Sequence, residues 1–229
     1  MTRVRMSFAA LCILSLSVAA LPAAAAGAPS DPKKQTSWGL YLTAREAFDM
    51  KTAAGDKVLF VDVRDPVEIM FTGFTDTVDV NVPFLLSNPA KWNEKKSVLL
   101  MERNPGFADG IEAALAARGL DKSVPVILMC RSGGTRGAPS AKSLEGRDFA
   151  AVYVVVDGFE GGTLKGDPRG PWRLKDGWKN SDLPWSNKLD RDKIHLRANS
   201  FWRARQLGTF DPDPGHGPLP PCLLTFRSN

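Results

Sequence analysis

One cysteine, Cys130, lies where an apolar run ends and a loop rich in glycine and arginine begins, in the segment VPVILMCRSGGTRG of residues 124–137. The backbone N–H groups of such a loop, and the positive end of a following helix dipole, stabilise a thiolate, which is the reactive form of cysteine. Arg131 and Arg136 add positive charge. The pattern predicts a cysteine nucleophile for an anionic substrate. The alternative is that Cys130 is only the buried end of a core strand, which would not need the glycines and arginines that follow it.

The elements that position this loop are predicted from alternating strand and helix patterns. Apolar, β-branched runs indicate strands at Val58–Val63, Val78–Phe84, Val124–Met129 and Ala151–Val156. Helical patterns occur at Ala44–Ala54, Pro66–Met70, Pro105–Arg118 and Pro139–Gly146. Thr43 and Glu46 form a capping-box pattern before the first of these helices. This order predicts an α/β domain with a mainly parallel sheet, in which ligands bind at the C-terminal edge of the strands.

Two stretches fit the alternation less well. Leu85–Met101 contains Pro89 and a charged run, and we expect it to be a surface insertion that returns to the fold near Val98. The other stretch, Gly158–Ser186, is rich in glycine and proline, which predicts a long loop. We expect this loop to pack on the fold through Trp172, Trp178 and Trp185.

Residues 1–26 have the pattern of a secretory signal peptide. Two arginines precede an apolar run of 14 residues, Phe8–Leu21, which is too short to span a bilayer comfortably. Small residues at Ala23–Ala26 provide a cleavage region. The mature protein is therefore expected to be periplasmic or secreted, without stable membrane insertion. We expect residues 27–39 to be a flexible leader, and residues 187–229 to be a largely irregular C-terminal extension.

Composition narrows the range of partners. The chain has 229 residues, of which 43% are hydrophobic, which is enough for a substantial core. Its net charge is +5, or about +3 without the two arginines of the signal peptide. This mild excess agrees with small anionic ligands, whereas nucleic-acid binding needs a denser basic patch, so no nucleic-acid partner is expected. His195 and His216 lack clustered ligand residues, and no glycine-rich nucleotide motif occurs, so neither a metal nor a cofactor is expected.

Three segments together resemble the rhodanese domain, in the order in which that family has them. They are Asp62-Val63-Arg64 with Glu68, Cys130-Arg131-Ser132-Gly133, and Asp157-Gly158-Phe159. The resemblance covers residues 40–186 and implies a three-layer domain, in which helices flank a mainly parallel central sheet. It also implies an enzyme, similar to the thiosulfate sulfurtransferases.

In that family the loop cysteine accepts sulfane sulfur from a small anionic donor, holds it as a persulfide and passes it to a thiol or cyanide acceptor. The matching residue is Cys130. The resemblance implies a substrate-binding loop made of Arg131, Ser132, Gly133, Gly134, Thr135 and Arg136. Arg131 would meet the sulfite end of thiosulfate, because arginine presents a planar fork to oxyanions. Asp62 and Arg64 are expected to form a structural pair near the site.

Other functions stay open on the same residues. Arg136 lies six positions after Cys130, a Cys-x5-Arg spacing that resembles the cysteine phosphatases and arsenate reductases, although Met129 stands where the phosphatases usually have histidine. A non-catalytic sulfur carrier or an oxyanion-binding module is a third interpretation. Cys222, the other cysteine of the mature chain, pairs with Cys130 in a disulfide, resolves its persulfide or does neither.

Overall fold

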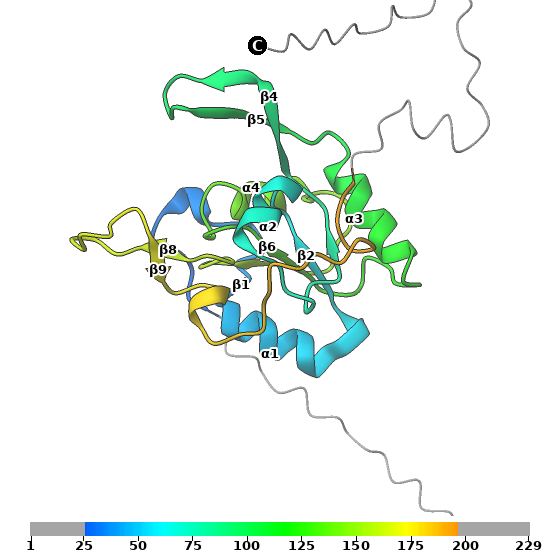
Figure 1. The fold of residues 1–229 in the computed structure, drawn as a ribbon. Coiled ribbons are helices and arrows are strands. Elements are labelled where there is room, and N and C mark those ends of the chain that lie inside the picture. The colour runs from blue at the N-terminus through cyan, green and yellow to red at the C-terminus, as the bar shows by residue number, and fades with distance from the viewer. Residues whose placement is uncertain (1–25, 197–229) are drawn as a thin grey trace, which may run out of the picture. The chain divides into compact units, whose positions relative to one another are not determined.

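The central sheet of the fold consists of five parallel strands within residues 26–196, the part of the chain that the structure, a computed structural model, describes. Their order is β1-β7-β6-β2-β3, so that β6, which leads into the cysteine loop, is the middle strand (Figure 1). The strands are β1 (Tyr41–Leu42), β2 (Leu59–Asp62), β3 (Val80–Asn81), β6 (Val126–Met129) and β7 (Val152–Val155). The prediction of an α/β fold with a mainly parallel sheet is confirmed.

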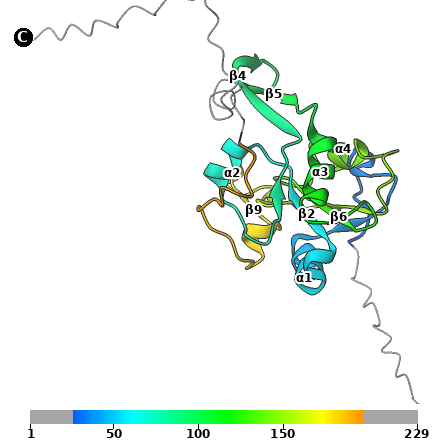
Figure 2. The ribbon, with the colours of Figure 1, turned by 90° about the vertical axis from the view of Figure 1, so that its right-hand side faces the viewer.

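Helices cover both faces of this sheet (Figures 1 and 2). They are α1 (Ala44–Ala54), α2 (Pro66–Thr72), α3 (Phe107–Ala116) and α4 (Gly137–Lys142), with 3-10 turns η1 (Pro32–Lys34), η2 (Gly55–Lys57) and η3 (Trp178–Asn180). On one face, Ile111 of α3 and Ala141 of α4 pack in a cluster with Leu128 of β6. On the other face, Ala47 of α1 packs in a cluster with Ile127, the neighbouring residue of β6. Successive strand residues thus point to opposite faces of the sheet and pack against different helices, as the pleat of a strand requires.

Helix α1 begins and ends where the sequence predicts. The Thr43 hydroxyl accepts a hydrogen bond from the Glu46 N–H, and the Glu46 carboxylate accepts one from the Thr43 N–H at 2.7 Å. Asp157, which follows β7, accepts hydrogen bonds from the N–H groups of Ala44, at 2.8 Å, and Gly177, at 3.0 Å. Burial raises the pKa of the Asp157 carboxyl group, although these two donors oppose the shift. Asp157 therefore ties the start of α1 to the end of β7.

The stretch Leu85–Met101, predicted as a surface insertion, contains most of a β-hairpin. In it β4 (Leu85–Asn93) pairs antiparallel with β5 (Val98–Arg103), and the hairpin extends away from the sheet (Figure 2). The register shifts between Asn88 and Trp92, on either side of Pro89. Proline cannot donate a ladder hydrogen bond, so it is tolerated only at such irregularities. The irregularity also breaks the strand alternation, which explains why the sequence did not reveal these two strands.

The stretch Gly158–Ser186, predicted as one long loop, contains a second hairpin. It is formed by β8 (Gly162–Thr163) and β9 (Arg173–Lys175), which pair antiparallel. Both strands are short and carry few apolar residues, so the sequence lacked the pattern that predicts strands. This hairpin follows β7 and therefore starts close to the edge of the sheet where the cysteine loop lies.

The three tryptophans of this stretch differ in burial. Trp178 is fully buried, and its ring contacts Phe48 and Phe60 at centroid distances of 5.8 and 5.7 Å. Trp185 is 40% exposed, and Trp172 is 62% exposed on the loop that connects β8 to β9. The prediction that all three tryptophans pack the stretch on the fold is therefore wrong for Trp172, because the hairpin carries it away from the core.

The segments on either side of the predicted domain also contact it. In the predicted leader, the Thr36 N–H donates a hydrogen bond to the Tyr41 hydroxyl at 2.8 Å. Beyond Ser186, Ile194 is buried in the same cluster as α1. The predicted signal peptide up to residue 25 and the predicted extension from residue 197 lie outside the described residues. None of the helices in the described part is both long and apolar enough to cross a bilayer.

Replacing Trp178 should test whether this residue holds the segment after β9 on the core. We expect Trp178→Ala to lower the free energy of unfolding by about 3–5 kcal/mol, because it removes a large buried side chain. The matched control Trp172→Ala should change it by less than about 0.5 kcal/mol, since that ring is exposed. Urea unfolding followed by circular dichroism measures both, and equal losses for the two variants would contradict the assignment.

Candidate active site

Cys130 lies at the centre of the C-terminal edge of the sheet. It follows Met129, the last residue of β6, and the residue is 2% exposed. It is a free cysteine, while Cys12 and Cys222 lie outside the described residues. In parallel α/β sheets this edge is where ligands bind. The position therefore suits a nucleophile, and the burial restricts access to it.

The loop after Cys130 lies directly against the end of β7. Gly133 has a φ of +64°, and a Cβ atom on it would lie 1.7 Å from the carbonyl oxygen of Val156. Gly158 has a φ of +65°, and a Cβ atom there would lie 2.5 Å from the carbonyl oxygen of Cys130. Both positions therefore need glycine, for its backbone freedom and for the absence of a side chain.

Two backbone hydrogen bonds join the same two segments. The Phe159 N–H donates to the Cys130 carbonyl, and the Glu160 N–H donates to the Arg131 carbonyl, both at 2.8 Å. These bonds continue the contact between β6 and β7 past the ends of the strands. The residues after β7 thus fix the position of the cysteine and the direction in which the loop leaves it.

Four successive N–H groups of the loop take no part in backbone pairing within the described chain. Those of Ser132, Gly133, Gly134 and Thr135 donate no hydrogen bond to another residue of the described chain. Backbone donors are seldom left without an acceptor unless water or a ligand provides one. Successive free N–H groups in a turn form a concave site for anions. Thr135 is exposed and Gly134 partly exposed, so the loop is open to solvent on its outer side.

Helix α4 begins immediately after the loop and closes over the cysteine. It starts at Gly137, two residues before the predicted start at Pro139. A Cβ atom on Gly137 would lie 2.8 Å from a methyl carbon of Val154 and 3.9 Å from the Sγ atom of Cys130. The missing side chain lets the helix pack against β7 and keeps the space beside the sulfur free.

Both arginines of the predicted site are already paired with carboxylates. Arg131 forms an ion pair with Glu160, and its side chain is 42% exposed. Arg136 is buried and donates from both Nη atoms to Glu68 of α2, at 2.5 and 2.8 Å. Burial lowers the pKa of the Arg136 guanidinium, but the hydrogen bond and the charge of Glu68 outweigh burial and raise it. The loop is therefore less positive than its sequence suggests.

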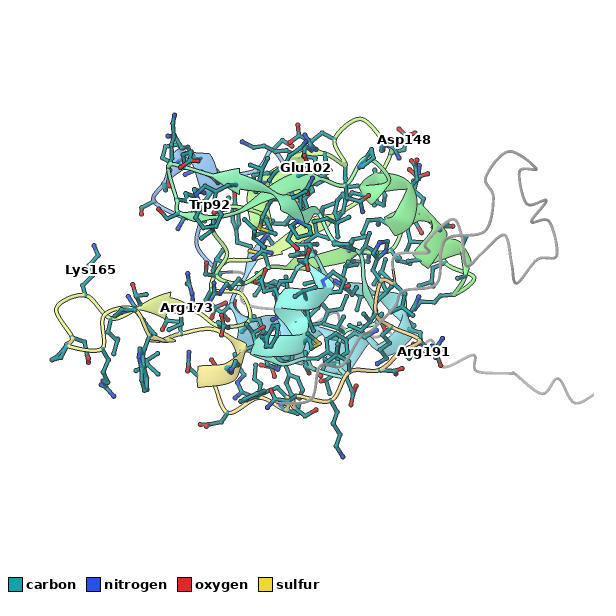
Figure 3. All side chains as sticks on the ribbon, turned by 45° about the horizontal axis from the view of Figure 1, so that its top comes forward. Trp92, Glu102, Asp148, Lys165, Arg173 and Arg191 are labelled. Atoms are coloured by element: carbon teal, nitrogen blue, oxygen red, sulfur yellow. The ribbon has the colours of Figure 1, made fainter. Side chains whose placement is uncertain are left out.

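A third arginine, Arg173 of β9, lies near the same site and was not predicted from the sequence. Its Nη1 atom donates to the Gly161 carbonyl at 2.7 Å. Burial lowers the pKa of the Arg173 guanidinium, and the charge of Arg131 lowers it further, while the charges of Glu160, Glu68 and Cys130 oppose this shift. Figure 3 shows Arg173 where the β8–β9 hairpin joins the body, with Lys165 at its far end. The folding of this hairpin brings Arg173 to Gly161, directly after the residues that bond to the cysteine loop.

Asp62 and Arg64 form an ion pair fully buried beneath the site. The distance from the Arg64 Nη2 atom to the Asp62 carboxylate is 2.5 Å, and both side chains are 0% exposed. Arg64 also donates to the Thr72 hydroxyl at 2.7 Å and lies over the Phe159 ring, 3.9 Å from its centroid. This pair connects the end of β2, the end of α2 and the segment after β7. Its enclosed position fits a structural role.

Comparison with known proteins adds little to this site. No protein-family model and no curated protein sequence matches the chain. Among solved structures, the crystal structure of Rv0390 from M. tuberculosis is similar, with 28% sequence identity and a TM-score of 0.46. The match covers 65% of this chain and 97% of that one. Within the described residues, His, Cys, Asp and Glu side chains form no group that could hold a metal ion. The function must be inferred from the site itself.

Substitution of two loop glycines should show whether the close approach of the loop to β7 determines its conformation. Gly133→Ala places a methyl group against the Val156 carbonyl, so the loop must move, and we expect the modification of Cys130 by small anionic reagents to slow at least about tenfold. Gly134→Ala is the matched control, because its nearest neighbour would be the Ser132 hydroxyl at 3.7 Å, an ordinary contact. Kinetics of thiol modification measure both variants. A similar rate for both would show that the close approach to β7 does not shape the loop.

Proposed function

We propose that this protein is a rhodanese-like sulfurtransferase that carries sulfane sulfur as a persulfide on Cys130. The observation that supports this function best is a cysteine beneath a loop whose N–H groups, from Ser132 to Thr135, have no acceptor among the described residues. A persulfide or a bound oxyanion would accept hydrogen bonds from these donors. The order of the quoted motifs, from Asp62 to Phe159, supports the rhodanese-like form of the three-layer fold.

The proposed reaction has two displacement steps at sulfur. In the first, the Cys130 thiolate attacks the outer sulfur of thiosulfate, the S–S bond of thiosulfate breaks, and sulfite leaves with the electron pair. In the second, a thiol acceptor as its thiolate, or cyanide, attacks the terminal sulfur of the persulfide and regenerates the Cys130 thiolate. The loop N–H groups hold the sulfur between the two steps. Electrons balance in each step, so the cycle needs no redox cofactor.

The place of this reaction in the cell is part of the proposal. The basic start, the short apolar run and the small residues of residues 1–26 support a secretory signal peptide and a periplasmic or secreted enzyme. The partners are then a small anionic sulfur donor and a thiol or cyanide acceptor. Neither nucleic acid nor stable membrane insertion belongs to the proposed function.

One observation favours a second candidate, a non-catalytic sulfur carrier or oxyanion-binding module. Cys130 is only 2% exposed, and Arg131 and Arg136 are already neutralised by carboxylates. Such a site would hold a small anion or a sulfur atom without fast turnover. The phosphatase or arsenate reductase interpretation has less support, because both Nη atoms of Arg136 are engaged by Glu68 and a phosphate would have to displace that carboxylate.

Mass spectrometry after thiosulfate treatment tests the proposed function. In a chain with Cys12→Ser and Cys222→Ser, Cys130 is the only cysteine. Thiosulfate should add one sulfur atom, about 32 mass units, because the thiolate takes the sulfane sulfur, and cyanide or a thiol should remove it. The further variant Cys130→Ser should take up nothing. Absence of the adduct on folded, reduced protein would contradict the proposal, and an adduct that cyanide cannot discharge would favour the carrier.

Arg136→Ala should act on stability rather than on the donor. The substitution leaves the partly buried Glu68 carboxylate without its ion-pair partner Arg136. We therefore expect the free energy of unfolding to fall by about 3 kcal/mol. Arg131→Ala breaks a more exposed pair and should cost less than about 1 kcal/mol. Thermal unfolding of both variants measures this difference. The parent protein should not hydrolyse an aryl phosphate, and hydrolysis that disappears in Arg136→Ala would support the phosphatase interpretation instead.

A further inference from the structure

Three arginines lie around Cys130, and they differ in how their charge is balanced. Arg131 is paired with Glu160, and Arg136 with Glu68. Arg173 forms no ion pair with any carboxylate of residues 26–196. Of these three arginines it is the one with no carboxylate of the described residues at ion-pair distance, although the charges of Glu160 and Glu68 act on it from farther away.

The position of Arg173 is set by the residues that hold the cysteine loop. Phe159 and Glu160 bond to the first two carbonyls of that loop, and Gly161 follows them directly. The Gly161 carbonyl accepts from the Arg173 Nη1 atom, and Arg173 pairs with Thr163 across the hairpin. The guanidinium is therefore anchored by one nitrogen at the base of the hairpin, and its other nitrogens donate no hydrogen bond to another residue of the described chain.

The electrostatic surroundings of Arg173 also indicate an anion. Arg131 is close enough for its positive charge to lower the pKa of Arg173, and burial lowers that pKa as well. The charges of Glu160, Glu68 and Cys130 oppose this shift without reversing it. A bound anion would stabilise two like charges held near each other. The only carboxylate that pairs with Arg131 among the described residues, Glu160, does not pair with Arg173.

We propose that Arg173 binds the oxygen-bearing, anionic end of the sulfur donor while the sulfane sulfur of that donor faces Cys130. This inference rests on the proposed function. It names the donor class as a small sulfur compound with a sulfonate-like or sulfite-like end, such as thiosulfate or an organic thiosulfonate. The end that Arg173 binds becomes the leaving group and gains negative charge as the S–S bond breaks. Arg173 therefore stabilises the transition state as well as the bound donor.

The test measures the loading of Cys130 by thiosulfate, in chains that keep Cys130 as the only cysteine. Arg173→Met removes the charge and keeps an apolar stem, and Arg173→Lys keeps the charge. Arg169→Met is the matched control, because Arg169 lies in the same hairpin but is exposed and paired with Asp167 at 2.8 Å. Quenched-flow mass spectrometry gives the second-order rate constant of loading at several ionic strengths, and cyanide discharge of the preloaded persulfide gives the second step.

We expect Arg173→Met to slow loading about 10- to 100-fold, the effect of losing one charge-assisted contact. Discharge by cyanide should change less than about threefold, because the sulfite end has already left by then, and Arg173→Lys should recover part of the loading rate. The fall in the loading rate with rising salt should also be weaker in Arg173→Met than in the parent, which a purely structural role would not produce.

The outcomes separate this inference from the function on which it rests. If the parent loads sulfur and Arg173→Met loads it as fast as Arg169→Met, the role of Arg173 is wrong while the sulfurtransferase function stands. Equal losses in loading and discharge, with unchanged salt dependence, would also overturn it, because they indicate a general disturbance of the loop. If the parent itself takes up no sulfur, the proposed function fails and the role of Arg173 fails with it.

Discussion

The close backbone approach between the cysteine loop and the end of β7 is the constraint on which the rest of the site depends. Gly133 and Gly158 lie on the two sides of this contact, and at both positions any side chain would overlap backbone atoms of the other segment. Two backbone hydrogen bonds reinforce it by joining the residues after β7 to the carbonyls of Cys130 and Arg131. Beyond this contact, the N–H groups from Ser132 to Thr135 donate to no other residue of the described chain.

Charge around the cysteine is arranged in pairs whose members come from different elements. Arg64 of the segment after β2 is paired with Asp62, and Arg136 before α4 is paired with Glu68 of α2. These pairs hold the helices and strand ends in place, and breaking one of them would leave a buried charge without a partner. The carboxylates of these pairs also neutralise positive charge that the sequence of the loop alone would assign to the site. The anionic substrate of the proposed function would therefore depend on a cation from outside the loop.

The parts of the fold that could be predicted are those specified by residues close together in the sequence. The start of α1 follows from Thr43 and Glu46, three residues apart in the capping box, its end follows from Gly55, and the strands around Cys130 follow from continuous apolar runs. The strands β4 and β5 escaped prediction because their pairing is irregular around Pro89. Within the site, the cysteine and its loop are contiguous and visible in the sequence. The partners of its arginines, and Arg173 itself, are distant in the chain and meet the loop only through the fold.

The burial of Cys130 restricts access to its sulfur. Because the residue is only 2% exposed, the donor of the proposed reaction would approach with one small atom leading, and a terminal sulfur meets this requirement. Gly137 contributes to this geometry, since the space that its side chain would fill begins 3.9 Å from the sulfur. For the proposed donor, with a terminal sulfur at one end and charged oxygens at the other, the cation that binds the oxygens would lie away from the cysteine. The β8–β9 hairpin, which starts where β7 ends, holds Arg173 against Gly161, directly after the residues that bond to the cysteine loop.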